Sequence, residues 1–169
     1  MGKITIYITI GIIAATGITA MNAKFVSAAS YRVTKVVDGD TISVRMGKND
    51  VLVRLIGVDA PELSSRSNTK KGCFAAQSKD YLSRKLLGKN VTLSGDYLSG
   101  DKDYYGRLLR YVYLNGEDIS RTLVLNGYAR QYKYWNNDYM NRYSYILLES
   151  VARATWRGLW NPWTCPVNR

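Results

Sequence analysis

Residues 54–63 read RLIGVDAPEL and combine an apolar run with one arginine, two acids and a proline. Its apolar run, Leu55–Val58, is typical of a buried strand, and acidic residues follow directly. Pro61 cannot donate a backbone hydrogen bond, so it should end the strand and fix the direction of Glu62. The stretch therefore predicts a core strand that carries the carboxylates of Asp59 and Glu62 to one end of a sheet.

The chain around this stretch is strongly basic. It has 169 residues, with 24 Lys and Arg against 13 Asp and Glu, which gives a formal charge of +11. The length suits one domain with an appendage, and a hydrophobic fraction of 46% is that of a globular protein. The charge favours a polyanionic partner, namely nucleic acid, an anionic membrane or an acidic polymer; a soluble protein of basic pI is the simpler interpretation.

Histidine is absent from the sequence. This excludes Ser-His-Asp and Cys-His catalysis, metal sites built on imidazole, and nucleases whose general base is histidine. Any acid–base chemistry must therefore use Asp, Glu, Lys, Tyr or Arg, and a hard metal ion would suit such a site.

The first residues of the chain resemble a targeting segment. Lys3 precedes an apolar stretch from Ile4 to Ala20, and the small residues of 26–29 follow. This pattern predicts that 1–29 is a secretory signal peptide, cleaved after Ala28 or Ala29, or else an uncleaved membrane anchor. In both cases residues 30–169 form the exported domain.

Two cysteines, Cys73 and Cys165, form an even pair in this exported domain. In an oxidising compartment a disulfide is the expected fate of such a pair, and it would tie the start of a central helix to the C-terminal tail. The alternative is two unrelated thiols.

Five strands and three helices are expected. β-branched residues predict strands at 31–37, 41–46 and 51–58 in meander order, followed by a helix at 74–87, strands at 90–93 and 108–114, a helix at 119–126, and a last helix from about 137–138 to Gly158. In the last helix the residues repeating at three- and four-residue spacing are Met140, Tyr143, Leu147, Val151 and Ala154. The order β-β-β-α-β-β-α-α predicts an α+β fold, a five-stranded OB-fold β-barrel with three helices.

Carboxylates follow two of the predicted strand ends. Asp40 lies in the turn after the first strand and Asp59 at the end of the third, so a meander could bring both to one end of the barrel. Two carboxylates that meet there would repel each other unless a cation lay between them, and their hard oxygens suit Ca²⁺ or Mg²⁺. For each acid alone, a turn residue or a solvated charge is the simpler interpretation.

Arg54 and Arg107 each begin a predicted strand or strand half. A guanidinium remains charged and can bind two phosphate oxygens at once. A surface salt bridge is the commoner use of a single arginine, and spacing alone does not place these two together.

Three blocks of sequence together resemble the staphylococcal nuclease (thermonuclease) family in order and spacing. They are Asp38-Gly39-Asp40-Thr41, the stretch from Arg54 to Glu62, and Asp103-Tyr104-Tyr105-Gly106-Arg107. The resemblance covers roughly residues 31–160 and implies an OB barrel with three helices. It also implies calcium-dependent hydrolysis of DNA and RNA that leaves 3′-phosphates.

The resemblance also implies roles for individual residues. Asp40 and Asp59 match the calcium carboxylates, and the Ala60 carbonyl, where the family usually has threonine, matches a main-chain ligand. Tyr104 stands where the reference member has lysine. The remaining matches are Arg54 and Arg107 as phosphate-binding arginines, Glu62 as the residue that orients or deprotonates the attacking water, Tyr105 near the phosphate of the nucleotide, and Tyr132 and Tyr134 beside the base.

The leading hypothesis is an exported Ca²⁺-dependent nuclease that acts on DNA and RNA. It is expected to be a monomer, and no protein partner is implied. If the N-terminal segment is not cleaved, that segment would associate with a membrane. The first alternative is a non-catalytic OB-fold module that binds nucleic acid. The second is a cationic surface protein that binds anionic envelope polymers, which would leave the paired acids without a role.

Overall fold

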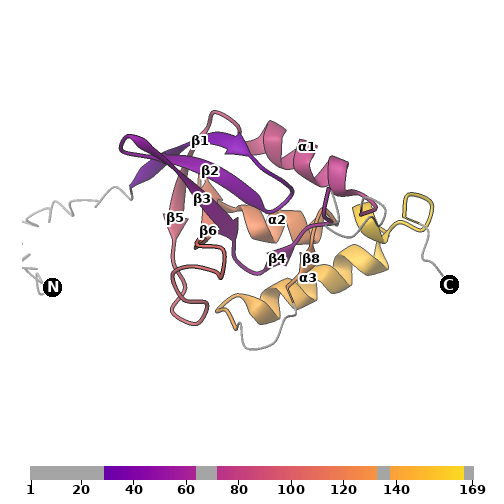
Figure 1. Cartoon of the computed structure of the whole chain (residues 1–169). Coiled ribbons are helices and arrows are strands. Elements are labelled where there is room, and N and C mark those ends of the chain that lie inside the picture. Colours follow the sequence, from indigo (N-terminus) through magenta and orange to yellow (C-terminus); the bar gives the residue numbers. More distant parts are fainter. Residues whose placement is uncertain (1–28, 64–71, 133–137, 166–169) are drawn as a thin grey trace, which may run out of the picture.

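The computed structural model describes residues 29–63, 72–132 and 138–165. One sheet has the strand order β3-β2-β1-β5-β6-β7, and β3 also pairs in parallel with β6, which closes β1, β2, β3, β5 and β6 into a barrel (Figure 1). The strands are β1 (Ser30–Val36), β2 (Thr41–Met46), β3 (Asn49–Leu55), β5 (Asn90–Ser94), β6 (Leu108–Leu114) and the short β7 (Glu117–Asp118). The prediction of a five-stranded barrel is confirmed.

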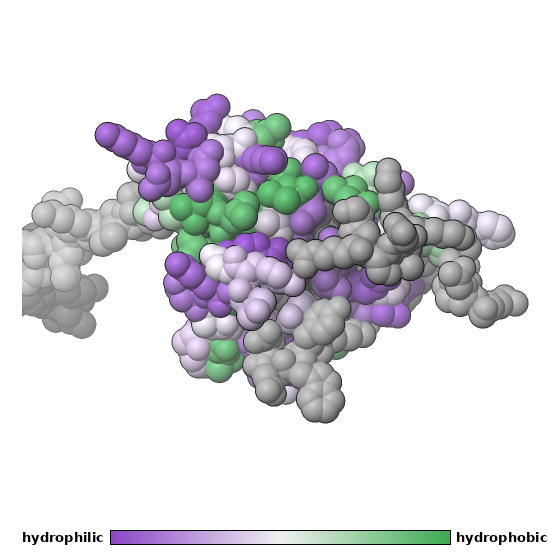
Figure 2. Space-filling model, viewed as in Figure 1, coloured by the Kyte–Doolittle hydropathy of each residue, from purple (hydrophilic) through white to green (hydrophobic). Residues whose placement is uncertain are grey.

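The barrel interior is filled by β-branched and leucine side chains. Val33, Ile42, Val44, Val53 and Val112 are fully buried there. This packing explains the β-branched runs of the sequence, because such side chains suit the pleated, half-buried surface of a strand. On the face seen in Figure 2, hydrophilic residues surround a band of hydrophobic ones.

Within the described residues three α-helices pack on the barrel and on one another, as predicted. They are α1 (Ala75–Leu86), α2 (Ile119–Leu125) and α3 (Arg142–Ala154), and the 3₁₀ turn η1 (Gly158–Trp160) follows. Leu82 and Leu86 of α1 and Leu123 of α2 are completely buried in the same core as the strands. In Figure 1, α2 lies between α1 and α3.

The predicted third strand, 51–58, is wrong in its extent. The chain turns at Ile56 and Gly57, and β4 (Val58–Asp59) leaves the barrel to pair with β8 (Arg130–Gln131). Gly57 has a φ of +78°, and a Cβ at this position would lie 2.6 Å from a ring carbon of Tyr139. A glycine is therefore required at the turn that leads from β3 into β4, where Asp59 pairs with β8.

The predicted start of the last helix is also wrong. Residue 137 lies outside the described residues, and α3 begins only at Arg142, whose guanidinium is 3.6 Å from the carboxylate of Asp138. Met140, predicted to lie on the apolar face of this helix, precedes its first turn. The other residues predicted to repeat do share a face of the helix, but that face is exposed. The helix packs instead through Tyr145, Glu149 and Ala152.

The disulfide between Cys73 and Cys165 is present, so this prediction is confirmed. The predicted signal peptide or anchor, 1–29, falls almost entirely outside the described residues. In the part of the chain that the structure describes, no helix has the length and apolar character needed to cross a membrane.

Candidate active site

Asp40 is the most buried acid of the predicted site, with 4% of its surface exposed. It lies in the turn between β1 and β2, and its Oδ2 accepts a hydrogen bond of 2.7 Å from the backbone N–H of Ala60. Its Oδ1 accepts one of 3.1 Å from the hydroxyl of Thr41. The first turn of the barrel is thereby tied to the end of β4.

Arg54, at the end of β3, lies between the two aspartates. Its Nη1 forms an ion pair with Oδ1 of Asp40, and its Nη2 lies 3.6 Å from Oδ1 of Asp59. Burial, and then the positive charge of Arg107, lower the pKa of this guanidinium from its ordinary value, while Asp59 raises it. The structure thus brings Asp40, Arg54 and Asp59 together, which spacing alone did not require.

Asp59 is held by the short β4–β8 pair, directly opposite Arg130. Burial raises the pKa of its carboxyl above the ordinary value, and the charges of Arg54 and Arg130 act in the opposite direction. Sequence reasoning missed Arg130. The signal available was the short Ala129-Arg130-Gln131 segment after α2, which could be recognised as a strand only from its partner.

Glu62 and Ala60 lie beside Asp59. A hollow of about 290 Å³ is lined by these three residues together with Arg130. Glu62 is exposed, and its negative charge is close enough to Arg54 to raise the pKa of that guanidinium. Ala60 is buried, and its N–H, as described, is bonded to Asp40.

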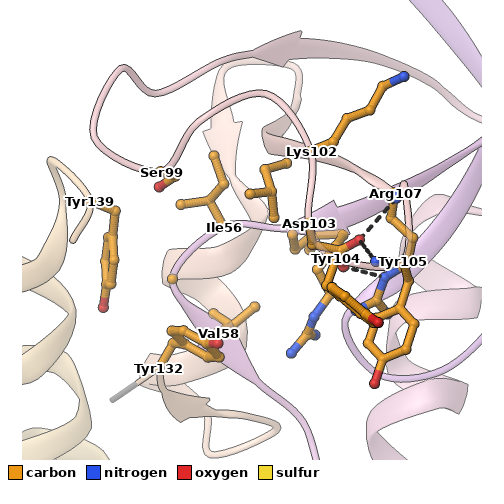
Figure 3. A pocket seen from close by; sticks show the side chains of 14 residues that line it. Ile56, Val58, Ser99, Lys102, Asp103, Tyr104, Tyr105, Arg107, Tyr132 and Tyr139 are labelled. Atoms are coloured by element: carbon orange, nitrogen blue, oxygen red, sulfur yellow. Dashed lines mark hydrogen bonds and ion pairs between the residues drawn. The ribbon is translucent and has the colours of Figure 1, made fainter. Parts of the chain in front are cut away.

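Arg107 reaches the site from the loop before β6. Its Nε lies 2.6 Å from Oδ2 of Asp103, and its backbone N–H donates to the other oxygen of the same carboxylate (Figure 3). Its Nη1 donates to the hydroxyl of Thr41 at 3.2 Å. Thr41 and Asp103 were not predicted as site residues, although both stand inside the motifs that were quoted.

A cavity of about 430 Å³ opens beside the arginines, lined by Arg54, Arg107 and several tyrosines. Figure 3 shows Tyr104, Tyr105 and Arg107 at one side of it, and Tyr132 and Tyr139 at the other. Tyr105 is 66% exposed, and its ring centre lies 5.4 Å from the guanidinium carbon of Arg107. Tyr134, also predicted to contact substrate, lies outside the described residues.

Asp40 and Asp59 are the carboxylates of this site that could hold a metal ion. Within 29–63, 72–132 and 138–165, no group of three or more His, Cys, Asp or Glu side chains is placed to hold one. The carboxylates of Asp40 and Asp59 do meet at one cationic group, the guanidinium of Arg54. Because carboxylate oxygens are hard donors, this pair fits Ca²⁺ or Mg²⁺ in donor chemistry.

Comparisons with known proteins place this chain among nucleases. Residues 52–162 match the family model described as staphylococcal nuclease homologue. The chain is 36% identical over 134 residues to a thermonuclease of Staphylococcus intermedius, covering 79% of this chain and 76% of the relative. It is 32% identical over 132 residues to the thermonuclease of Staphylococcus hyicus (78% and 76%), and 35% identical over 131 residues to an uncharacterized endonuclease of Escherichia coli O157:H7 (77% and 76%).

Proposed function

Because this chain belongs to the staphylococcal nuclease family, we propose that it is an exported, calcium-dependent nuclease. It hydrolyses phosphodiester bonds of DNA and RNA and leaves 3′-phosphates. The observation that carries the proposal is the placement of Arg54 against both Asp40 and Asp59, with Arg107 linked to the same cluster through Thr41. Two carboxylates and two guanidinium groups are therefore joined in one cluster, and the cavity lined by the two arginines would take the phosphodiester.

Arg54 and Arg107 bind the phosphate in this proposal. Both side chains line the cavity of about 430 Å³, and both are largely buried, with 13% and 23% of the side chain exposed. Negative charge grows on the phosphoryl oxygens in the transition state, and fixed guanidinium groups in a partly dry site stabilise it more than water does. Asp103 fixes the direction of the Arg107 guanidinium.

Asp40, Asp59 and the carbonyl oxygen of Ala60 would hold the calcium ion. When bound, the ion supplies further positive charge to the phosphoryl oxygens. Arg54 neutralises both carboxylates in this structure. With an ion held by Asp40 and Asp59, the Arg54 guanidinium would be available to bind the phosphate.

Glu62 orients the attacking water and accepts its proton. The water oxygen forms a bond to phosphorus while the bond from phosphorus to the 5′ oxygen breaks, and the leaving 5′ oxygen takes a proton from solvent water. This leaves the phosphate on the 3′ side. The exposed position of Glu62, beside Asp59 in the smaller hollow, supports this role because water reaches it there.

Export and a monomeric state belong to the same proposal. Residues 1–29 act as a signal peptide, or as a membrane anchor if they are not cleaved, and the disulfide suits an oxidising compartment. The predicted partners are DNA and RNA substrates.

Plasmid DNA tests this proposal against a non-catalytic OB-fold module that only binds nucleic acid. The expected result is nicking with calcium, no nicking after a calcium chelator is added, and 3′-phosphate ends on the products. Binding without nicking in calcium would favour the binding module.

A further inference from the structure

The disulfide lies beside the proposed water-activating residue. Cys73 and Cys165 line the same hollow of about 290 Å³ as Asp59 and Glu62. The bridge joins residues 92 positions apart, so it connects the start of α1 to the C-terminal tail at the edge of the site.

Gly72 connects the bridge to Glu62. The backbone N–H of Gly72 donates a 2.9 Å hydrogen bond to the carbonyl oxygen of Glu62. A Cβ on Gly72 would lie 3.0 Å from Cβ of Pro61 and 3.1 Å from that same carbonyl oxygen. The backbone of Glu62 therefore packs tightly against the residue that directly precedes Cys73.

The other end of the bridge is fixed. The N–H of Cys165 donates to the carbonyl of Asn161 at 2.8 Å, and the N–H of the buried Leu159 donates to the carbonyl of Gly127 at 2.9 Å. Through these contacts the tail is attached to the end of α2. The disulfide consequently ties Cys73 to a tail segment that is itself bonded to the residues after α2.

We propose that the Cys73–Cys165 disulfide positions Glu62 for catalysis, acting through the Gly72–Glu62 backbone contact. This rests on the role of Glu62 in the proposed function. Glu62 follows Pro61 outside any strand, so no ladder of sheet hydrogen bonds fixes it. The phosphate-binding arginines are held by other contacts, Arg54 by Asp40 and Arg107 by Asp103.

The double variant Cys73→Ser/Cys165→Ser separates positioning from stability. It is assayed at a temperature where circular dichroism shows that it is folded. Misplacing a catalytic group by about 1 Å can cost about a hundredfold, so we expect kcat to fall at least about tenfold. KM should stay within about twofold, because substrate binding is retained. A variant with lower thermal stability but unchanged kcat would overturn the proposal.

Amide hydrogen exchange gives a readout besides activity. Because the Gly72 N–H is bonded to Glu62, it should exchange at least about tenfold faster in the double variant than in the wild type. The amide of Val112, in the fully buried part of β6, serves as the internal reference. Unchanged protection of Gly72 would overturn the proposal.

Gly72→Ala tests the same contact with the disulfide intact. The added methyl group must displace Pro61 or Glu62, so we expect a lower kcat and little change in KM. Gly95→Ala is the matched control, since its Cβ would meet only a side-chain nitrogen of Arg110 at 4.0 Å. Equal kcat for the two alanine variants would overturn the proposal.

Glu62→Gln shows whether the bridge acts through this residue. If it does, removing the disulfide from the Glu62→Gln variant should change its residual kcat by less than about twofold. A further tenfold loss would mean that the disulfide acts elsewhere. If the oxidised wild type does not cleave DNA, the proposed function fails, and the exchange of Gly72 still decides whether the bridge holds this segment.

Discussion

Thr41 accepts a hydrogen bond from Arg107, with 3.2 Å between its Oγ1 and Nη1 of the arginine. The same hydroxyl donates to the buried carboxylate of Asp40 at 3.1 Å. One side chain of β2 thus joins a proposed metal ligand to a proposed phosphate ligand. The two halves of the site come from segments that are far apart in the sequence, and this hydroxyl connects them directly.

Thr41→Val should lower kcat/KM about tenfold or more, because a hydrogen bond to a charged group typically contributes about 1.5–3 kcal/mol. Thr41→Ser keeps the hydroxyl and should retain most of the activity. Steady-state cleavage of a DNA oligonucleotide measures both. Equal activity of the valine and serine variants would contradict this role.

Arg54→Ala, Arg107→Ala and Glu62→Gln should each reduce turnover at least about a hundredfold, since each removes a group that acts on the developing charge or on the water. Arg45→Ala is the matched control, because this arginine side chain is 50% exposed and pairs with the surface Asp50. Single-turnover cleavage in calcium measures the effect. Near-normal turnover in all three site variants would refute the assignment.

Tyr105→Ala should raise KM for single-stranded DNA about tenfold, because stacking on an exposed aromatic ring contributes about 1–3 kcal/mol per base. Tyr104 is 97% exposed and meets Tyr105 edge to face, so its alanine variant should act in the same direction. Tyr97→Ala is the control, since this ring is 80% exposed but lines a different hollow. A larger effect at Tyr97 than at Tyr105 would contradict the placement of substrate.

Asp96 should make the stability of the fold depend on pH. Its carboxylate accepts hydrogen bonds from the Tyr111 hydroxyl at 2.6 Å and the Met140 N–H at 2.7 Å, which fixes the segment before α3 beside the cavity. Burial alone would raise the pKa of this carboxyl, but these hydrogen bonds lower it below its ordinary value of 3.8. The carboxylate therefore contributes stability above pH 3.8, and this is lost as the pH falls through the lower folded-state pKa.

Asp96→Asn should therefore cost about 2 kcal/mol of unfolding free energy at neutral pH. The difference from wild type should shrink in acid, below the folded-state pKa. Urea unfolding at neutral pH and at a pH below the folded-state pKa measures this difference in unfolding free energy. Asp80→Asn, at an exposed carboxylate, is the control. A difference that is independent of pH would show that the charge of Asp96 contributes nothing.

The barrel strands could be predicted because β-branched runs bounded by turns are local features. The parallel pairing of β3 with β6 could not, since it joins segments distant in sequence. The turn at Gly57 depends on the rings of Tyr139 and Tyr145, which no local pattern reveals. The buried face of α3 could not be predicted from apolar spacing because it includes polar groups. The Tyr145 hydroxyl donates to Asp118, and Glu149 accepts from the N–H of Gln131.

The candidate site divides in the same way. Asp40, Arg54 and Asp59 could be selected from their motifs, and the structure brings them together. Thr41 and Arg130 could not be selected from the sequence. Their roles depend on partners that are distant in sequence: Arg107 for the Thr41 hydroxyl, and Asp59 for Arg130.

Calcium titration by calorimetry, with activity followed in parallel, tests the central claim most directly. The wild type should bind one calcium ion per chain at the site, and Asp40→Asn and Asp59→Asn should each abolish this binding and the calcium-dependent cleavage, while Asp50→Asn at the surface should retain both. Calcium binding and cleavage that are the same in all four proteins would contradict the account.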